Sequence, residues 1–225
     1  MTPARTPTIR PFRDDDAAAV RRLFWTTLVG GAPTPFDPAH PLMRSYEALC
    51  LDWYLGAGAR SASVIVDGKD EPVGYALVCC DQRSARRSAV RASVRFLAAA
   101  TDSAVRGRLD ARLRTFARLR MRDATTLARP RRHDVPDAHA HLNLSAEARN
   151  TRCVLAVRDV IDRTVVESGH YGWAGEINTR RGRRARALER SGFTVVGRDP
   201  NHTLSWLTGE PVERLTVVRQ VERRG

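Results

Sequence analysis

Near the middle of the chain, a short strand leads through a polar turn straight into a helix, and this junction constrains the fold more than any other feature. Residues 138–144 (AHAHLNL) alternate in polarity, as expected for a strand with one face on a core. Residues 151–168 carry apolar side chains at helical spacing, namely Val154, Val157, Ile161 and Val165. Gly169 follows, where a helix is expected to end. A strand that feeds a helix in this way indicates an α/β protein.

The same two kinds of segment alternate along the rest of the chain. Strands are expected at residues 9–12, 63–66, 73–80, 171–177, 194–196 and 215–221. Helices are expected at residues 14–28, 46–54, 90–99, 109–119 and 183–191. We therefore expect one domain over residues 1–225, built on a mixed central sheet flanked by helices. A helical insertion at 82–135 is expected to precede the central strand.

This insertion is strongly basic. The chain has a net charge of +13, and residues 82–132 contain 15 arginines but only 3 aspartates, so this stretch alone carries 15 − 3 = +12. We expect Leu109, Leu113 and Phe116 to pack on the domain. The arginines then form either a solvated face or a surface for an anionic partner. Nucleic acid is the less favoured partner, because Phe96 and Phe116 fall at core positions and leave no stacking platform.

The cysteines argue against a metal site and against disulfides. Cys50, Cys79, Cys80 and Cys153 lack metal-binding spacing, and neighbouring strand residues point to opposite faces and do not easily bridge. No apolar run approaches the roughly 18 residues needed to cross a bilayer. The first residues lack the apolar segment of a secretory signal. We therefore expect a cytoplasmic protein without a bound metal.

Several segments, taken in order, resemble the GCN5-related N-acetyltransferase (GNAT) family. IRPFRDDDAAAVRRLF is similar to that family's first strand and helix, and VIVDGKDEPVGYALV is similar to its second and third strands. AHLNLSAEAR is similar to its central strand and the turn after it, and RALERSGFTVVGR to its late helix, turn and strand. The resemblance leaves out the insertion. It implies a GNAT-like mixed sheet and transfer of an acyl group from a thioester to an amine.

The resemblance also implies where the acyl donor binds. In the family, backbone N–H groups of the turn after the central strand hold the pyrophosphate of acetyl-CoA, and glycines let the backbone approach it closely. In this chain the corresponding residues are Arg149, Asn150, Thr151, Arg152, Cys153 and Val154. The pantetheine arm is expected beside Leu142 to Leu144, with Asn178 as a hydrogen-bonding residue.

Residues 149–154 contain no glycine, and this leaves three readings of the turn. The segment still binds pyrophosphate, with two arginines supplying charge. Alternatively, it accepts an acyl-phosphopantetheine arm on a carrier protein, which brings no pyrophosphate. In the third reading the site is inactive, and the chain serves as a binding module.

Catalysis of acyl transfer needs a base for the amine, and family members often add a tyrosine that protonates the leaving thiolate. The matching position is Leu188 in ALERSGF, and leucine cannot transfer a proton. His139 and His141 share one face of the central strand, because strand residues two apart point the same way. A neutral imidazole can accept the proton of an ammonium group. We therefore expect His141, and after it His139, as the candidate base.

The sequence thus predicts an N-acyltransferase that uses acetyl-CoA or another acyl-CoA and a small-molecule amine. The first alternative is a catalytically degenerate or carrier-protein-dependent protein of this fold, with an acidic acyl carrier protein as partner. The lost glycines and Leu188 favour it. The second alternative is an acyltransferase that acts with nucleic acid, such as charged tRNA. The basic insertion favours that one.

Overall fold

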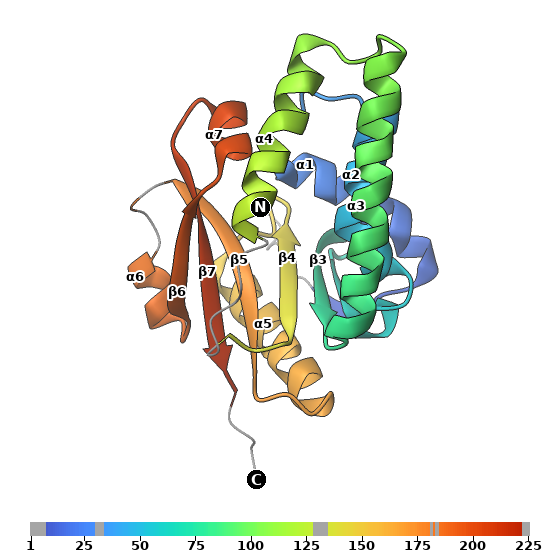
Figure 1. Cartoon of the computed structure of the whole chain (residues 1–225). Coiled ribbons are helices and arrows are strands. Elements are labelled where there is room, and N and C mark those ends of the chain that lie inside the picture. Colours follow the sequence, from blue (N-terminus) through green and yellow to red (C-terminus); the bar gives the residue numbers. More distant parts are fainter. Residues whose placement is uncertain (1–7, 30–33, 128–134, 181, 183–184, 222–225) are drawn as a thin grey trace, which may run out of the picture.

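The computed structural model describes residues 8–29, 34–127, 135–180, 182 and 185–221 (Figure 1). Within these residues, seven strands form one sheet in the order β1-β2-β3-β4-β5-β7-β6. The strands are β1 (Thr8–Pro11), β2 (Ala62–Val66), β3 (Pro72–Cys79), β4 (His139–Leu144), β5 (Gly172–Arg180), β6 (Thr194–Pro200) and β7 (Val212–Gln220). The helices are α1 (Ala17–Leu28), α2 (Pro41–Leu55), α3 (Gln82–Val105), α4 (Ala111–Leu127), α5 (Thr151–Glu167), α6 (Ala185–Arg190) and α7 (His202–Thr208). The expected mixed α/β sheet, with helices inserted before the central strand β4, is confirmed.

Helices cover both faces of the sheet, and each face has its own core. The first core lies between the sheet and α1 to α4, and its largest buried members include Tyr46, Tyr75 and Phe116. The second core lies between the sheet and α5, around residues such as Val157, Ile161, Val165 and Trp173. Ala140 and Leu144 of β4 belong to the second core. Because side chains alternate along a strand, His139 and His141 point to the side of the first core.

The insertion forms a helical hairpin of α3 and α4 (Figure 1). Leu113 and Phe116 are buried in the first core, as expected, and Leu109 packs against it. Among the described residues of the hairpin, every arginine except Arg120 is exposed. α3 is longer than the helix expected at 90–99, and its outer face also exposes apolar side chains, namely Val90, Val94 and Leu97. Residues 128–134 of the expected insertion lie outside the described residues.

The sequence pattern predicts no helix between the last two strands, and this prediction is wrong, because α7 lies between β6 and β7. Asn201 caps α7, because its side chain accepts a hydrogen bond from the Leu204 N–H at 2.9 Å. Asp123 of α4 accepts bonds from the N–H and the hydroxyl of Thr203, at 3.0 and 2.6 Å. A helix of 7 residues is too short to be stable alone and depends on such tertiary bonds. This dependence explains why the local pattern does not reveal it.

The four cysteines are free thiols. Cys79 belongs to the first core and Cys80 packs against the second, so the two neighbours point to opposite sides of the sheet, as expected. No helix within the described ranges is long and apolar enough to cross a membrane. The described histidine, cysteine and acidic side chains form no group of three or more suited to a metal ion.

Candidate active site

The central strands β4 and β5 run side by side only briefly. They pair in parallel at His139↔Ala174 and Ala140↔Gly175, and then separate although β4 continues to Leu144 and β5 to Arg180 (Figure 1). On its other edge, β4 pairs with β3 along its whole length. Among the described residues, the facing edges of β4 and β5 do not pair with each other beyond Ala140, so backbone N–H and C=O groups along this opening can bond a guest molecule. The expected site residues lie on β4, at the junction between β4 and α5, and on β5.

His141 lies where the two strands begin to separate. Its ring packs edge-on against Tyr54 of α2, with centroids 5.3 Å apart, and against His139 at 5.9 Å. His141 is an exposed residue, but its ring is crowded by neighbouring side chains, and the resulting desolvation lowers the pKa of His141. The carboxylate of Glu176 partly opposes this shift. His141 is therefore neutral and accessible at neutral pH, as a general base must be.

His139 is held on both of its ring nitrogens. The side-chain amide nitrogen of Gln82 lies 3.0 Å from Nδ1 of His139 and also donates to the Asp137 carbonyl at 2.5 Å. Since that carbonyl can only accept, the amide nitrogen is the donor, and Nδ1 of His139 is an acceptor. Nε2 then carries the hydrogen and donates it to the hydroxyl of Tyr54, 2.5 Å away. These bonds fix His139 as a neutral residue that positions Tyr54 beside His141.

Glu176 of β5 faces the same side as His141. Trp173 lies in the second core, so even-numbered residues of β5 point the other way, towards α4. The Glu176 carboxylate is exposed and lies 3.8 Å from Nε of Arg214, a nearly buried cation on β7. It interacts electrostatically with His141 and with Arg120 of α4. Glu176 follows the last paired residue of β5 as His141 follows that of β4, so the two lie across the separation from each other, and Glu176 also couples electrostatically to the Arg120 guanidinium.

Asn143 and Asn178 also face this side of the sheet. The side-chain nitrogen of Asn143 donates to the hydroxyl of Tyr75, and burial raises the pKa of that hydroxyl above its usual range. Asn178, expected to bond the pantetheine, accepts a hydrogen bond from Asn201 at 2.9 Å. Asn178 is thereby tied to the start of α7 and keeps its own amide nitrogen as a donor.

The junction between β4 and α5 begins with a capped helix. The side chain of Asn150 accepts a hydrogen bond from the Cys153 N–H at 2.9 Å, which is the bond of an N-cap. The amides of Thr151 and Arg152 have no partner within the helix, because the first turn always leaves such groups free of intrahelical bonds. One amide that a phosphate would need is thus occupied by Asn150, and others remain for an anion.

The side chains at this junction are arranged unequally. Arg149 and Arg152 are exposed, and a guanidinium nitrogen of Arg149 donates to the Leu144 carbonyl at 3.0 Å. Cys153 is buried in the second core, whereas Val154 is 37% exposed. Leu142, on the strand before the turn, is 36% exposed and Leu144 is buried. The junction therefore combines an apolar strand surface with two solvent-facing cations.

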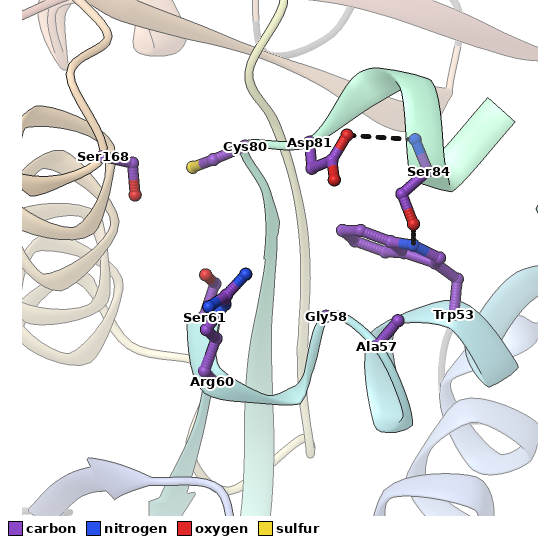
Figure 2. Close-up of a pocket in the computed structure, with 9 residues that line it drawn as sticks. All are labelled: Trp53, Ala57, Gly58, Arg60, Ser61, Cys80, Asp81, Ser84 and Ser168. Atoms are coloured by element: carbon purple, nitrogen blue, oxygen red, sulfur yellow. Dashed lines mark hydrogen bonds between the residues drawn. The ribbon is translucent and has the colours of Figure 1, made fainter.

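A separate hollow of about 220 Å³ lies beside the C-terminal end of β3 (Figure 2). Trp53 donates its indole N–H to the Ser84 hydroxyl at 3.0 Å, and Asp81 accepts from the Ser84 N–H at 3.0 Å. Figure 2 shows Cys80 and Ser168 on the opposite wall from Trp53. None of the expected site residues lines this hollow. Asp81 thereby caps α3, and Trp53 and Ser84 pair with each other.

Three residues at the opening were not expected as site residues: Tyr54, Arg120 and Glu176. Tyr54 fits the apolar stripe of its helix, so the sequence gives no reason to single it out. Arg120 is one of 15 arginines in a stretch where all look alike. Glu176 lies two residues before Asn178 on an expected strand, and this spacing was an available signal. Leu188, on α6, is half-buried.

Comparison with known proteins identifies the fold. No protein-family model matches the chain, and no curated protein matches it by sequence. The crystal structure of SsHAT has a TM-score of 0.61 at 19% identity, over 97% of this chain and 100% of that chain. The yncA structure from Salmonella typhimurium, which contains acetyl-CoA, has a TM-score of 0.53 at 13% identity, over 98% and 97% of the two chains.

A phosphinothricin acetyltransferase of the GNAT superfamily from Sinorhizobium meliloti, in complex with AcCoA, has a TM-score of 0.53 at 17% identity. The likeness covers 96% of this chain and 89% of that one. Because these identities are low, the likenesses establish the fold and not the reaction. The chain has the GNAT fold that the sequence resemblance implied.

Proposed function

We propose that this protein is an N-acyltransferase that moves an acyl group, most simply acetyl, from a CoA thioester to an amine. The observation that carries the proposal is the separation of β4 from β5 with His141 at its start. The opening supplies unpaired strand edges for an extended pantetheine arm. Leu142 supplies apolar surface on the strand, and the start of α5 supplies amides for phosphates.

In this proposal the opening has two sides. The donor side consists of residues 142–154, where Arg149 and Arg152 bind the phosphates together with the first amides of α5. The acceptor side consists of Tyr54, Arg120, His141 and Glu176. A neutral His141 takes a proton from the ammonium group of the acceptor, and Tyr54, held by His139, keeps the His141 ring in place.

The bond changes then balance without a further acid. The free amine attacks the thioester carbonyl carbon, a C–N bond forms, the C–S bond breaks, the nitrogen releases its second proton to water and CoA leaves as its thiolate. A thiol has a pKa of about 8.5, so its thiolate is a good leaving group and takes a proton from water. Leu188 in place of a tyrosine is compatible with such a reaction, because orienting the amine supplies much of the rate.

The carrier-protein alternative is favoured by a specific observation on the donor side. The Asn150 side chain occupies an amide of the first turn, and the glycines that allow close approach are missing. A phosphopantetheine arm brings only one phosphate and needs fewer amides. The exposed arginines of α3, namely Arg83, Arg86, Arg87, Arg91 and Arg95, would suit an acidic acyl carrier protein.

Free cysteines and thioester chemistry support a reducing, cytoplasmic setting.

Calorimetry and a thiol-release assay test the proposal together. We expect acetyl-CoA to bind at micromolar concentration, and free thiol to appear when a suitable amine is added. His141→Gln is expected to slow thiol release by about 10²- to 10⁴-fold and leave acetyl-CoA binding intact. His170→Gln changes a histidine outside the opening and should leave both intact. Absence of acetyl-CoA binding at high micromolar concentration, with turnover of an acyl carrier protein, would establish the carrier-protein alternative. Absence of both would overturn the proposal.

A further inference from the structure

Arg120 differs from the other arginines of the insertion by its surroundings. The neighbouring α4 residues Arg112, Arg114, Arg118 and Arg122 are exposed, whereas Arg120 is half-buried. Its guanidinium carbon lies 4.9 Å from the ring centroid of Tyr46, a residue of the first core that is 5% exposed. The arginine that points inward is therefore held at a defined place between α2 and the sheet.

Arg120 forms no ion pair with any residue that the structure describes. Asp123 lies one helical turn away, but its carboxylate oxygens accept bonds from His202 and Thr203 at the start of α7. Asp123 and, after it, Glu176 stabilise the Arg120 cation electrostatically, and neither carboxylate reaches salt-bridge distance from it. A guanidinium remains charged under all ordinary conditions, and the surroundings of Arg120 favour the charged form despite its burial. An anion that binds beside it adds a charge-assisted bond.

Glu176 provides a negative charge near the positively charged Arg120. It faces the acceptor side from β5, and its electrostatic interactions reach both His141 and Arg120. Arg214 lies 3.8 Å from the Glu176 carboxylate, and Glu176 itself is exposed. The acceptor side thus presents a carboxylate near the candidate base and a guanidinium farther along, which is a dipolar surface.

We infer that the acceptor is a zwitterionic amine, an amino acid or a molecule of amino-acid type, whose carboxylate binds Arg120 and whose amino group lies between Glu176 and His141. This inference rests on the proposed function, of which it specifies the acceptor. The charges match in sign and order: Glu176 attracts the ammonium group, His141 removes its proton, and Arg120 receives the carboxylate. An amine without a carboxylate leaves Arg120 unpaired and binds less well.

The test compares amines that differ only in the carboxylate. Each pair consists of an amino acid and the amine that remains when its carboxylate is removed, assayed with acetyl-CoA by thiol release. For wild type we expect kcat/KM to favour the carboxylate-bearing member by about 10- to 100-fold, the value of one charge-assisted pair. Arg120→Gln is expected to remove this preference by raising KM for the amino acid, with little change for the bare amine.

Matched variants and a binding measurement separate the outcomes. Arg118→Gln removes an exposed arginine of the same helix and should keep the preference, whereas Arg120→Lys should keep part of it. Amino-acid binding, measured by calorimetry in the absence of turnover, should weaken in Arg120→Gln only. Turnover with equal preference for both members of every pair would overturn the inference and leave the proposed function standing. Arg120-dependent binding without turnover would support the inferred site and overturn the proposed function. Absence of amino-acid binding in the wild type would overturn the inference.

Discussion

The donor and acceptor sides of the opening are built in different ways. On the donor side, the phosphates would meet backbone amides of α5 and exposed arginines, all within one short segment of the chain. On the acceptor side, side chains converge from α2, α4, β4 and β5, namely Tyr54, Arg120, His141 and Glu176. A helix start has free amides whatever its sequence, so the amides proposed to bind the phosphates do not depend on glycines. The acceptor side depends on each side chain.

The largest expected effect is on the acceptor side. Replacing His141 with alanine removes the base, and kcat/KM should fall by about 10²- to 10⁴-fold. Affinity for acetyl-CoA, measured by calorimetry, should not change, because the described ring contacts of His141 are with Tyr54 and His139 and not with residues 149–154. If the variant binds acetyl-CoA much more weakly, the two sides are not independent. A variant with wild-type kcat/KM would show that another group is the base.

Changes on the donor side should affect binding rather than turnover. Arg149→Ala and Arg152→Ala should each weaken acetyl-CoA binding by about 1–3 kcal/mol if their charge-assisted bonds form. Arg149 already bonds the Leu144 carbonyl, so its loss also disturbs the turn, and its effect should be accompanied by a lower melting temperature. Wild-type affinity in both variants would mean that the phosphates lie elsewhere.

Asn150 tests whether a capped helix start competes with phosphate. Asn150→Ala removes the bond to the Cys153 N–H and should lower the free energy of unfolding by about 1 kcal/mol. Asn150→Gly should lower the free energy of unfolding by only about a few tenths of a kcal/mol, since glycine is a fair N-cap residue. The glycine variant also frees an amide and opens the approach, so it should bind acetyl-CoA more tightly than wild type. Weaker binding would show that Asn150 itself contacts the donor.

The smallest expected effect is a displacement of a pH profile. Burial lowers the pKa of His141 below its usual 6.5, so kcat/KM should rise with pH and level off before neutrality. Glu176 raises this pKa, and Glu176→Gln should therefore shift the rise to lower pH. The same histidine titrates at a higher pH in the unfolded chain, so its contribution to stability is lost as pH falls below 6.5. If the pH profile of Glu176→Gln is unshifted, Glu176 does not influence the pKa of His141 in the reaction.

The sequence predicts the parts of this molecule that are periodic. The alternation at 138–144 and the helical stripe of α5 lead correctly to a central strand followed by a helix, and the order of segments leads to the fold. The positions of the histidines on one face follow from the same period. What the sequence cannot provide is where two strands stop pairing, because β4 and β5 keep their patterns after they separate.

The acceptor side was hidden for a related reason. Arg120 has the same local pattern as its exposed neighbours, and only the packing of α4 over Tyr46 distinguishes it. Tyr54 has the spacing of a core residue, and its hydroxyl bond to His139 joins positions 85 residues apart. α7 is absent from the pattern because long-range bonds from Asp123 hold it. The sequence pattern misses each of these features because each depends on a contact between segments that are distant in the sequence.

The brief pairing of β4 with β5 has a consequence for the mechanics of the whole molecule. Strands β1-β2-β3-β4 pair with strands β5-β7-β6 at only two described residue pairs, His139↔Ala174 and Ala140↔Gly175. The sheet therefore consists of two halves that are joined over a short stretch. A ligand that forms hydrogen bonds with both strand edges would connect the two halves of the sheet and stabilise them against separation. Amide exchange along residues 141–144 should therefore slow when the ligand binds, and the melting temperature should rise with ligand concentration.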